Sequence, residues 1–319
     1  SMSITHSMVF YFCKKGKRQY VSGRDQNYPA RRAEEEKQNR FAAAPRSVRI
    51  RRMQADGAEV ELLSRPQNPT DRIILYLHGG GFVVGSVKTR RMFTGYLAAK
   101  LGFNVAAPEY RLAPEHPFPA APRDCFAAYR ALLEEYAPER IVLFGESAGG
   151  NLVLSILLQI RQAGLPMPAA ALCFSPCVQF DKTLPSYVQN RDTEAMVDDL
   201  WTEVRDVYLG GKDSAAVRDP LAAPYYGSFA DCPPICLWAS ESEVLRDDSL
   251  LLFEKLKAEG HPCRLYLRKG MIHTWLIIPT IPEAKKDLKT VKDCLDRAMA
   301  GTLRGCAVPI RLEDWNGQD

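Results

Sequence analysis

The stretch "FGESAGG", from Phe144 to Gly150, places a serine between two glycines where a strand-like run changes to a helix-like one. In a Gly-x-Ser-x-Gly turn of this kind, Ser147 could act as a nucleophile, because the turn lifts its hydroxyl clear of the sheet. The N-terminus of the following helix would favour negative charge that develops nearby. The alternative is a plain turn in which the serine caps the helix.

A second glycine-rich stretch, "LHGGGFVVG", follows the apolar run "IILY". Three glycines after a strand leave backbone N–H groups free to point at one place, as an oxyanion hole for acyl transfer requires. Such a loop is expected to act with the N–H of the residue after the nucleophile, here Ala148. A flexible or phosphate-binding loop is the alternative. However, no Gly-Lys-Ser/Thr follows, and Gly79, Gly81 and Gly85 miss the dinucleotide-binding spacing by one.

A general base is expected among the five histidines. His273, in "RKGMIHTW", comes after a late strand and before the last helix. In open α/β sheets the active site lies beyond the carboxyl ends of the strands. His273 is late in the chain and on this edge, which predicts that it is the base rather than a structural histidine.

A third group should orient the imidazole, and the expected chain order is serine, acid, histidine. The acidic candidates after the strand-like run "PPICLWAS" are Glu241, Glu243, Asp247 and Asp248. The two aspartates fall in the first turn of a predicted helix, where acids favour the helix dipole, so we expect structural roles for them. The spacing does not decide whether Glu241 or Glu243 orients the imidazole.

These residues must be positioned by an alternation of strands and helices. Apolar runs typical of buried strands occupy residues 72–78, 102–110, 140–145, 169–176, 233–240 and 261–270. Helical spacing occupies residues 119–137, 149–164, 246–260 and 282–300. An earlier hairpin is predicted around Asp56-Gly57. The pattern predicts an α/β fold with a mostly parallel sheet covered on both faces and some antiparallel strands at one edge.

The alternation breaks at four places. Residues 1–8 are expected to be a loose terminus, and residues 24–46 to form one or two solvated helices. Residues 181–212 are polar helical material, and the tail from Gly301 fits none of these units.

Composition excludes several classes. The net charge of +4 over 319 residues gives no argument for a nucleic-acid partner. The nine cysteines lack partner ligands at zinc-binding spacing, so no metal or cofactor is expected and free thiols in a reducing compartment are favoured. No run approaches the length of a membrane span, and the apolar and basic residues near the start stand in the wrong order for a signal peptide. The expected location is cytoplasmic.

Five motifs together carry a resemblance. "HGGGF", "YRLAPEHPFPA", "GESAGG", "SEVLRDD" and "GMIHTW" occur in this order between about residues 73 and 275. Their set resembles the hormone-sensitive-lipase-like esterases of the α/β-hydrolase fold. In that family the acid stands in Asp-x-Leu-Arg-Asp. This chain has "EVLRD", so the resemblance implies Glu243, one methylene longer, with Glu241 as a less favoured substitute.

The resemblance also implies roles for backbone amides and for a cap. The N–H groups of Gly80 and Gly81, with that of Ala148, would form the oxyanion hole, and Gly79 would be needed for the turn. Arg111, in "YRLAPE", is expected to pair with Glu146 or Glu115.

The implied division of the chain is a cap from residues 1–45 and 181–212, a hydrolase core from residues 46–180 and 213–300, and a C-terminal tail at 301–319. Some apolar cap residues would shape the pocket and others would pack on the core: Phe10, Phe12, Phe41, Tyr187, Met196, Leu200, Trp201, Val204 and Tyr208. Family members often pair through a sheet edge, which implies a homodimer.

The expected activity is hydrolysis of small carboxylic esters with short acyl chains. Hydrolysis of a lactone, carbamate or formamide is an alternative on the same residues, because the pocket, not the triad, separates these substrates. A ligand-binding receptor of the same fold is a further alternative. Such receptors typically lose a triad member, usually the histidine, whereas Ser147 and His273 are both present here.

Overall fold

The computed structural model describes residues 2–17, 27–197 and 201–317. Within them one nine-stranded sheet has the order β1-β2-β4-β3-β5-β6-β7-β8-β9. The strands are β1 (Arg49–Ala55), β2 (Ala58–Ser64), β3 (Ile73–Leu77), β4 (Asn104–Pro108), β5 (Ile141–Glu146), β6 (Ala170–Phe174), β7 (Ile235–Ser240), β8 (Cys263–Arg268) and β9 (Ile310–Arg311). The β1–β2 and β2–β4 pairs are antiparallel and the others parallel. The predicted α/β fold is confirmed.

The α-helices are α1 (Ile4–Lys17), α2 (Tyr28–Gln38), α3 (Arg91–Lys100), α4 (Ala120–Leu133), α5 (Ala148–Ala163), α6 (Pro185–Gln189), α7 (Arg246–Ala258) and α8 (Pro282–Met299). The other helical segments are η1 (Lys88–Arg90), η2 (Pro138–Arg140), η3 (Trp201–Tyr208, a π-helix), η4 (Ala215–Arg218), η5 (Pro224–Tyr226) and η6 (Trp275–Ile277). No helix in the described ranges is both long and apolar enough to cross a membrane.

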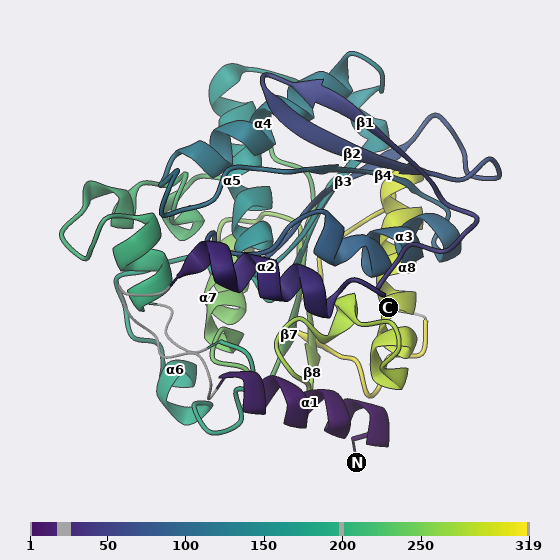
Figure 1. Ribbon diagram of the computed structural model, residues 1–319. Helices are drawn as coiled ribbons and strands as arrows, with labels where there is room; N and C mark the ends of the chain where they lie inside the picture. The colour runs from purple at the N-terminus through teal and green to yellow at the C-terminus, as the bar shows by residue number, and fades with distance from the viewer. Residues whose placement is uncertain (1, 18–26, 198–200, 318–319) are drawn as a thin grey trace.

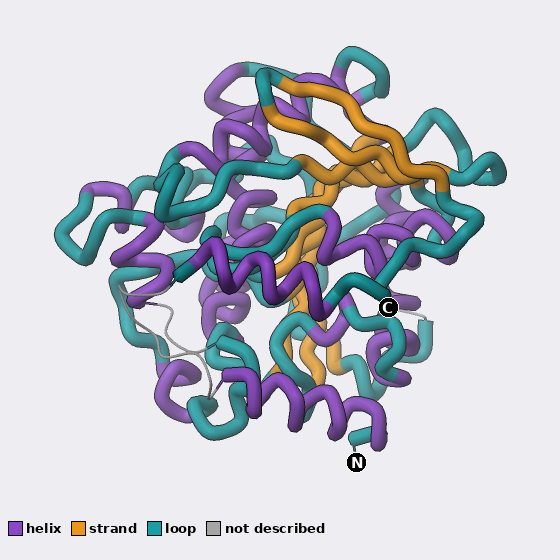
Figure 2. Tube along the Cα trace, in the orientation of Figure 1, coloured by secondary structure: helices purple, strands orange, loops and turns teal. Residues whose placement is uncertain are grey.

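The sheet lies between two layers of helices (Figures 1 and 2). Side chains alternate along each strand, so Leu143 of β5 packs on the face covered by α4, α5 and α7, whereas Phe144 packs on the face covered by α3 and α8. Both faces are buried, which explains why these strands are continuous apolar runs in the sequence. Helix α3 was missed in the sequence, because its apolar stripe is short.

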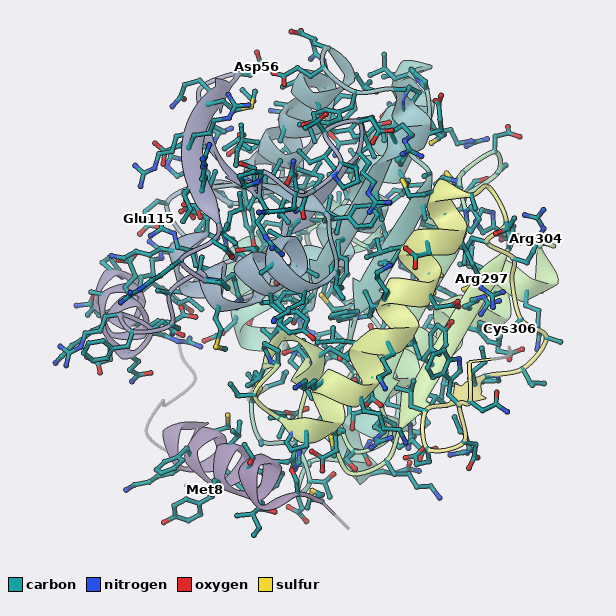
Figure 3. The ribbon with its side chains drawn as sticks, turned by 90° about the vertical axis from the view of Figure 1, so that its right-hand side faces the viewer. Met8, Asp56, Glu115, Arg297, Arg304 and Cys306 are labelled. Carbon is teal, nitrogen blue, oxygen red and sulfur yellow. The ribbon has the colours of Figure 1, made fainter. Side chains whose placement is uncertain are left out.

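The β1–β2 hairpin turns at Asp56 and Gly57, as predicted. Both residues have positive φ, 46° and 85°, which suits the tight turn between twisted strands. Figure 3 shows Asp56 at the exposed tip of this hairpin.

The loose start predicted for residues 1–8 is wrong, because α1 begins at Ile4 and packs on the core. The N–H and hydroxyl of Ser3 donate to the carboxylate of Glu283 at 2.6 and 2.7 Å, at the start of α8. His6 is fully buried. Figure 3 shows α1 at one end of the molecule, with Met8 on its outer side.

The tail, for which the sequence predicted no unit, completes the sheet. It passes through Arg304 and Cys306 along the side of the molecule (Figure 3) and then forms β9, parallel to β8. The sheet therefore ends at β1 on one side and at β9 on the other. The division into cap and core, and pairing of two copies through an edge, stay predictions.

Candidate active site

Ser147 lies in the turn between β5 and α5. Its backbone has φ 55° and ψ −117°, a strained conformation that the surrounding contacts impose. A Cβ on Gly145 would lie 2.3 Å from the carbonyl oxygen of Gly149, and a Cβ on Gly149 would lie 1.9 Å from that of Leu77. Only glycine fits at either position, so the two glycines allow the turn that raises the Ser147 hydroxyl above the sheet.

The structure brings Ser147, His273 and Glu243 into one chain of hydrogen bonds. His273 Nε2 lies 2.9 Å from Ser147 Oγ, and His273 Nδ1 lies 2.5 Å from Glu243 Oε2. With Nδ1–H donating to the carboxylate, Nε2 is left as an acceptor for the serine hydroxyl. The three residues follow β5, β8 and β7, which are parallel, so their loops meet at one edge of the sheet.

The extra methylene of Glu243 is accommodated by the loop after β7. Its second oxygen, Oε1, accepts hydrogen bonds from Ser240 N–H and from Ser175 Oγ–H, both at 2.8 Å. The amide of Asn190 donates to the backbone carbonyl of Glu243 at 2.8 Å. The side chain is buried and held at both oxygens, so the glutamate reaches His273 in a fixed orientation.

The other acids of this region lie elsewhere. Glu241 forms an ion pair with Arg311 at 2.5 Å, on the side of the tail. Asp247 accepts from Ser186 N–H at 2.8 Å, and Asp248 accepts from Val178 N–H at 2.9 Å. The two aspartates therefore tie residues 178–186 to the start of α7, which fits the structural roles expected for them.

The glycine loop after β3 borders the same cavity as Ser147 and His273. Gly80 and Gly81 line it together with Ala148. Gly80 has φ 126°, and a Cβ there would lie 2.2 Å from the carbonyl oxygen of Val84. Gly79 does not line the cavity. Its N–H donates to Glu146 Oε1 at 2.6 Å, and a Cβ would collide with the Glu146 carboxylate, so this glycine is required for the turn.

The cavity has a volume of about 490 Å³. Both segments predicted to form the cap contribute to its wall. They supply Cys13, Arg31, Glu35, Gln38, Asn39, Met196, Val197, Glu203 and Val204. Arg31 of α2 and Glu203 of η3 form an ion pair across this wall.

The apolar residues expected in the cap divide between the cavity and other positions. Met196 and Val204 line the cavity, whereas Tyr208 stacks on Phe82 with ring centroids 3.9 Å apart. Phe12 and Phe41 are exposed to solvent, at 62% and 81%. Phe10, Tyr187 and Trp201 are partly buried against the core. Leu200 lies outside the described residues.

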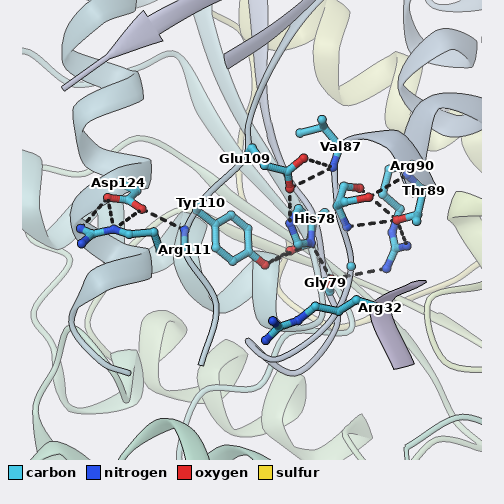
Figure 4. Close-up of polar contacts among 12 residues, drawn as sticks. Arg32, His78, Gly79, Val87, Thr89, Arg90, Glu109, Tyr110, Arg111 and Asp124 are labelled. Carbon is cyan, nitrogen blue, oxygen red and sulfur yellow. Dashed lines mark hydrogen bonds and ion pairs between the residues drawn. The ribbon is translucent and has the colours of Figure 1, made fainter. Parts of the chain in front are cut away.

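The pairing expected for Arg111 is wrong. Arg111 follows β4 and points toward α4, where its guanidinium binds Asp124 at 2.9 Å (Figure 4). Glu146 is instead bound by Arg90 at 2.8 Å, and Glu115 by Arg32 at 2.9 Å. Asp124 lies one turn into α4 and also accepts a hydrogen bond from the backbone N–H of Arg111 at 2.9 Å, so one carboxylate binds both the backbone and the side chain of Arg111.

Comparison with known proteins decides the family. The model of an α/β-hydrolase-fold family matches residues 74–277. An esterase of the bacterial hormone-sensitive lipase family superposes with a TM-score of 0.86 at 32% identity, over 94% of this chain and 99% of the other. The chain belongs to the hormone-sensitive-lipase-like esterases.

Curated relatives of this esterase carry matching activities. An acetyl-hydrolase of Streptomyces hygroscopicus is 37% identical over 70% of this chain and 75% of the relative. An esterase of Acinetobacter venetianus is 30% identical over 77% of this chain and 82% of the relative. The protein is therefore a carboxylic ester hydrolase, and the receptor alternative is not supported.

The pKa values of two buried histidines of the esterase, His273 and His78, are shifted in opposite directions. Burial works against a charged His273, but the hydrogen bond and the negative charge of Glu243 outweigh it and raise the pKa of His273. At His78, burial and the nearby Arg90 charge lower the pKa to about 3. His78 is therefore neutral at physiological pH, stacked on Tyr110 with ring centroids 4.2 Å apart (Figure 4).

Several supporting residues of the esterase were missed in the sequence. Ser175 and Ser240 hold Glu243, and Arg90 holds Glu146. Ser175 and Ser240 could have been found, because Ser175 directly follows β6 and Ser240 is the last residue of β7, at the edge of the sheet where the site forms. No sequence signal indicated Arg90. In the described ranges, no group of three or more His, Cys, Asp or Glu side chains could hold a metal ion.

Proposed function

We propose that this esterase hydrolyses short-acyl carboxylic esters through an acyl-enzyme on Ser147. The observation that carries the proposal is the unbroken series of contacts from Ser147 Oγ through His273 to Glu243, with Ser147 and His273 in the wall of one cavity. In the acylation step, Ser147 Oγ bonds to the ester carbonyl carbon while its proton passes to His273 Nε2. Glu243 stabilises the imidazolium that forms.

The negative charge of the tetrahedral intermediate falls on the former carbonyl oxygen. We assign its stabilisation to the N–H groups of Gly80, Gly81 and Ala148, with Gly79 as the residue that allows the loop to turn. Support comes from their common position on the cavity beside Ser147. The carbon–oxygen bond to the alcohol then breaks, and His273 returns its proton to that alcohol.

Deacylation repeats these steps with water. His273 takes a proton from water as the oxygen attacks the acyl carbon, and Ser147 leaves with the proton from His273. The products are one alcohol and one carboxylic acid, and the enzyme returns to its starting state.

The acyl-chain preference rests on the pocket and on one neighbour. A cavity of about 490 Å³ suits a small ester. A structure of the esterase EstE5, obtained after soaking with p-nitrophenyl butyrate, is 33% identical and covers 91% of this chain with a TM-score of 0.81. We therefore expect p-nitrophenyl acetate and butyrate to be better substrates than long-chain esters. A chain-length series that peaks at long acyl chains would contradict this preference.

The mechanism is tested by Ser147→Ala. Turnover of p-nitrophenyl butyrate should fall by about 10⁴-fold or more, because the nucleophile is lost. A fluorophosphonate probe should label the wild-type protein and not this variant. Full activity in Ser147→Ala would overturn the mechanism. Parallel assays with a lactone, a carbamate and a formamide of similar size test the alternative substrates.

We also propose a cytoplasmic location. The support is chemical, because all nine cysteines, which lie within the described residues, are unpaired, as expected in a reducing compartment. Fractionation of the source cells should recover the esterase with cytoplasmic markers, and recovery from the medium would contradict the proposal.

A further inference from the structure

Helix α2 binds the loop that carries the oxyanion-hole glycines. Glu35 Oε2 accepts a hydrogen bond from Gly85 N–H at 2.9 Å, and Arg32 Nε donates to the carbonyl of Val83 at 2.7 Å. Arg32 also donates to Ala113 O at 2.7 Å. The contacts join a helix before the sheet to a loop about fifty residues later, and Figure 4 shows Arg32 beside this loop.

Gly85 packs directly against the backbone of the glycine loop at residues 79–81. It has φ 89°, and a Cβ there would lie 2.4 Å from the carbonyl oxygen of Gly79. The backbone of Gly85 is thus packed against that of Gly79 with no room for a side chain. The N–H of Val84 also donates to Gly80 O at 3.0 Å, so a shift of Gly85 would carry Gly79 and Gly80 with it.

Arg90 extends the connection from α2 to the residue before the nucleophile. Its Nη1 donates to Glu35 Oε1 at 3.4 Å, and its Nε donates to Glu146 Oε1 at 2.8 Å. Glu146 Oε1 also accepts from Gly79 N–H at 2.6 Å. Arg90 Nη2 lies 3.4 Å from Gly79 O.

The Arg90 guanidinium lies between the carboxylates of Glu146 and Glu35, and this arrangement holds the connection in place. Glu146 is 2% exposed and Arg90 13% exposed, so both charges are largely removed from water. Between the two carboxylates, the guanidinium is held strongly in its charged form: burial opposes the charge, but Glu146 and Glu35 outweigh it and raise the pKa of Arg90. A buried charge that loses one partner is destabilised, so Arg90 depends on Glu35 as well as on Glu146.

From these contacts we propose that Glu35 is a positioning residue for the esterase reaction. It holds the Gly80 and Gly81 amides in register with Ala148 through Gly85 and through Arg90. The proposal rests on the function proposed above, in which these amides stabilise the oxyanion. Stabilisation of that charge depends on donors fixed before the reaction, so a loose loop lowers kcat. Helix α2 therefore acts on the chemical step as well as on the shape of the cavity.

The test compares Glu35→Ala with Glu35→Gln on p-nitrophenyl butyrate. Glu35→Ala removes both acceptors and should lower kcat by about 10- to 100-fold, less than the direct loss of an oxyanion-hole donor. Glu35 lines the cavity, but its carboxylate oxygens are bound by Gly85 N–H and Arg90, so we assign it no hydrogen bond to the ester and expect KM to change by less than about threefold. Glu35→Gln keeps an oxygen for Gly85 N–H but loses the charge beside Arg90, so its kcat should fall between the wild type and Glu35→Ala.

Glu36→Ala is the matched control. Glu36 lies on the same helix and pairs with Lys88 at 3.2 Å, with both side chains about half exposed. Its kcat and KM should match those of the wild type. A decrease equal to that of Glu35→Ala would mean that any change on α2 disturbs the enzyme, and it would overturn the specific role of Glu35.

A transition-state analogue separates positioning from general loss of structure. A trifluoromethyl ketone that adds to Ser147 forms an oxyanion in the same place as the ester. Glu35→Ala should weaken its binding by the same factor as kcat/KM, while the midpoint of thermal unfolding is followed in parallel. Unchanged binding of the ketone, or unchanged kcat in folded Glu35→Ala, would overturn the proposal. If Glu35→Ala fails to fold, Glu35→Gln carries the same test.

Failure of the proposed mechanism looks different. An active Ser147→Ala would remove the acyl-enzyme mechanism whatever Glu35 does. An inactive Ser147→Ala combined with fully active Glu35 variants would leave the mechanism in place and refute the role of α2.

Discussion

The Nε2 atom of His6 accepts a hydrogen bond from the backbone N–H of Ile272 at 3.1 Å. This bond ties α1 to the residue immediately before His273, although 266 positions separate its partners. Ser3 fixes the same helix to Glu283. The loop that carries the base is therefore supported by the first helix of the chain, as the glycine loop is supported by the second.

His6→Ala should destabilise the esterase and reduce its activity. The change leaves the buried Ile272 N–H without an acceptor, which costs about 1–3 kcal/mol in the free energy of unfolding. Denaturant unfolding measures the loss, and kcat on p-nitrophenyl butyrate reports the looser base loop. His6→Gln supplies an oxygen acceptor and should recover part of both. Equal values for His6→Ala and the wild type would show that α1 does not support the loop.

The same histidine predicts a dependence of stability on pH. Burial, partly opposed by Glu283, lowers the pKa of His6 below its ordinary value of 6.5. As the pH falls below about 6.5, the unfolded chain takes up a proton at this position that the folded chain resists, so stability is lost on the acid side. His6→Gln should lose less stability than the wild type between pH 8 and pH 5. Parallel thermal unfolding curves of the two proteins check this difference.

Activity should fall on the acid side for a separate reason. His273 must be neutral to accept the Ser147 proton, and Glu243 raises its pKa above 6.5 despite burial. The value of kcat/KM should therefore decline as the pH falls through a midpoint above 6.5. Glu243→Gln removes the charge that stabilises the imidazolium, so the midpoint should move to lower pH and kcat should fall by about 10³-fold or more. An unchanged midpoint in Glu243→Gln would contradict the assignment of the acid.

Glu243→Asp tests the extra methylene. The shorter side chain cannot reach His273 while it also keeps its bonds to Ser175 and Ser240, so kcat should fall by about 10- to 100-fold through misplacement of the imidazole. Glu241→Asp is the matched control, because that carboxylate pairs with Arg311 away from the site and its kcat should not change. Wild-type activity in Glu243→Asp would show that the loop adapts freely.

Gly149→Ala should destabilise the turn at the nucleophile. The added methyl group would lie 1.9 Å from Leu77 O, so strand and helix must separate, and we expect a loss of about 3 kcal/mol or more in the free energy of unfolding. Gly164→Ala is the control. Gly164 is the C-cap of the same helix, has φ 65° and has no neighbouring atom within 4 Å of an added Cβ, so only backbone strain of about 1 kcal/mol is expected. Similar losses in both variants would show that the steric contact is relieved easily.

The sequence predicted those parts of the fold and site that depend on local pattern. The buried strands, the Asp56-Gly57 turn and the positions of Ser147 and His273 follow from periodicity and from the rule that loops after parallel strands meet at one edge. The sequence did not predict the contacts made by Glu35, Arg90 and His6. Each joins segments far apart in the chain through an ordinary charged or polar residue, and no spacing rule indicates such a partner.

The long separation in sequence between His6 and Ile272 also determines when the esterase can become active during its synthesis. The chain emerges N-terminus first at roughly 5–20 residues per second, so α1 waits about 10–50 s for Ile272 to be made. His273 is added next, and Glu283 follows soon after. The first helix and the base thus gain their partners almost together, so a nascent chain should have no esterase activity until residues 272–283 have been translated.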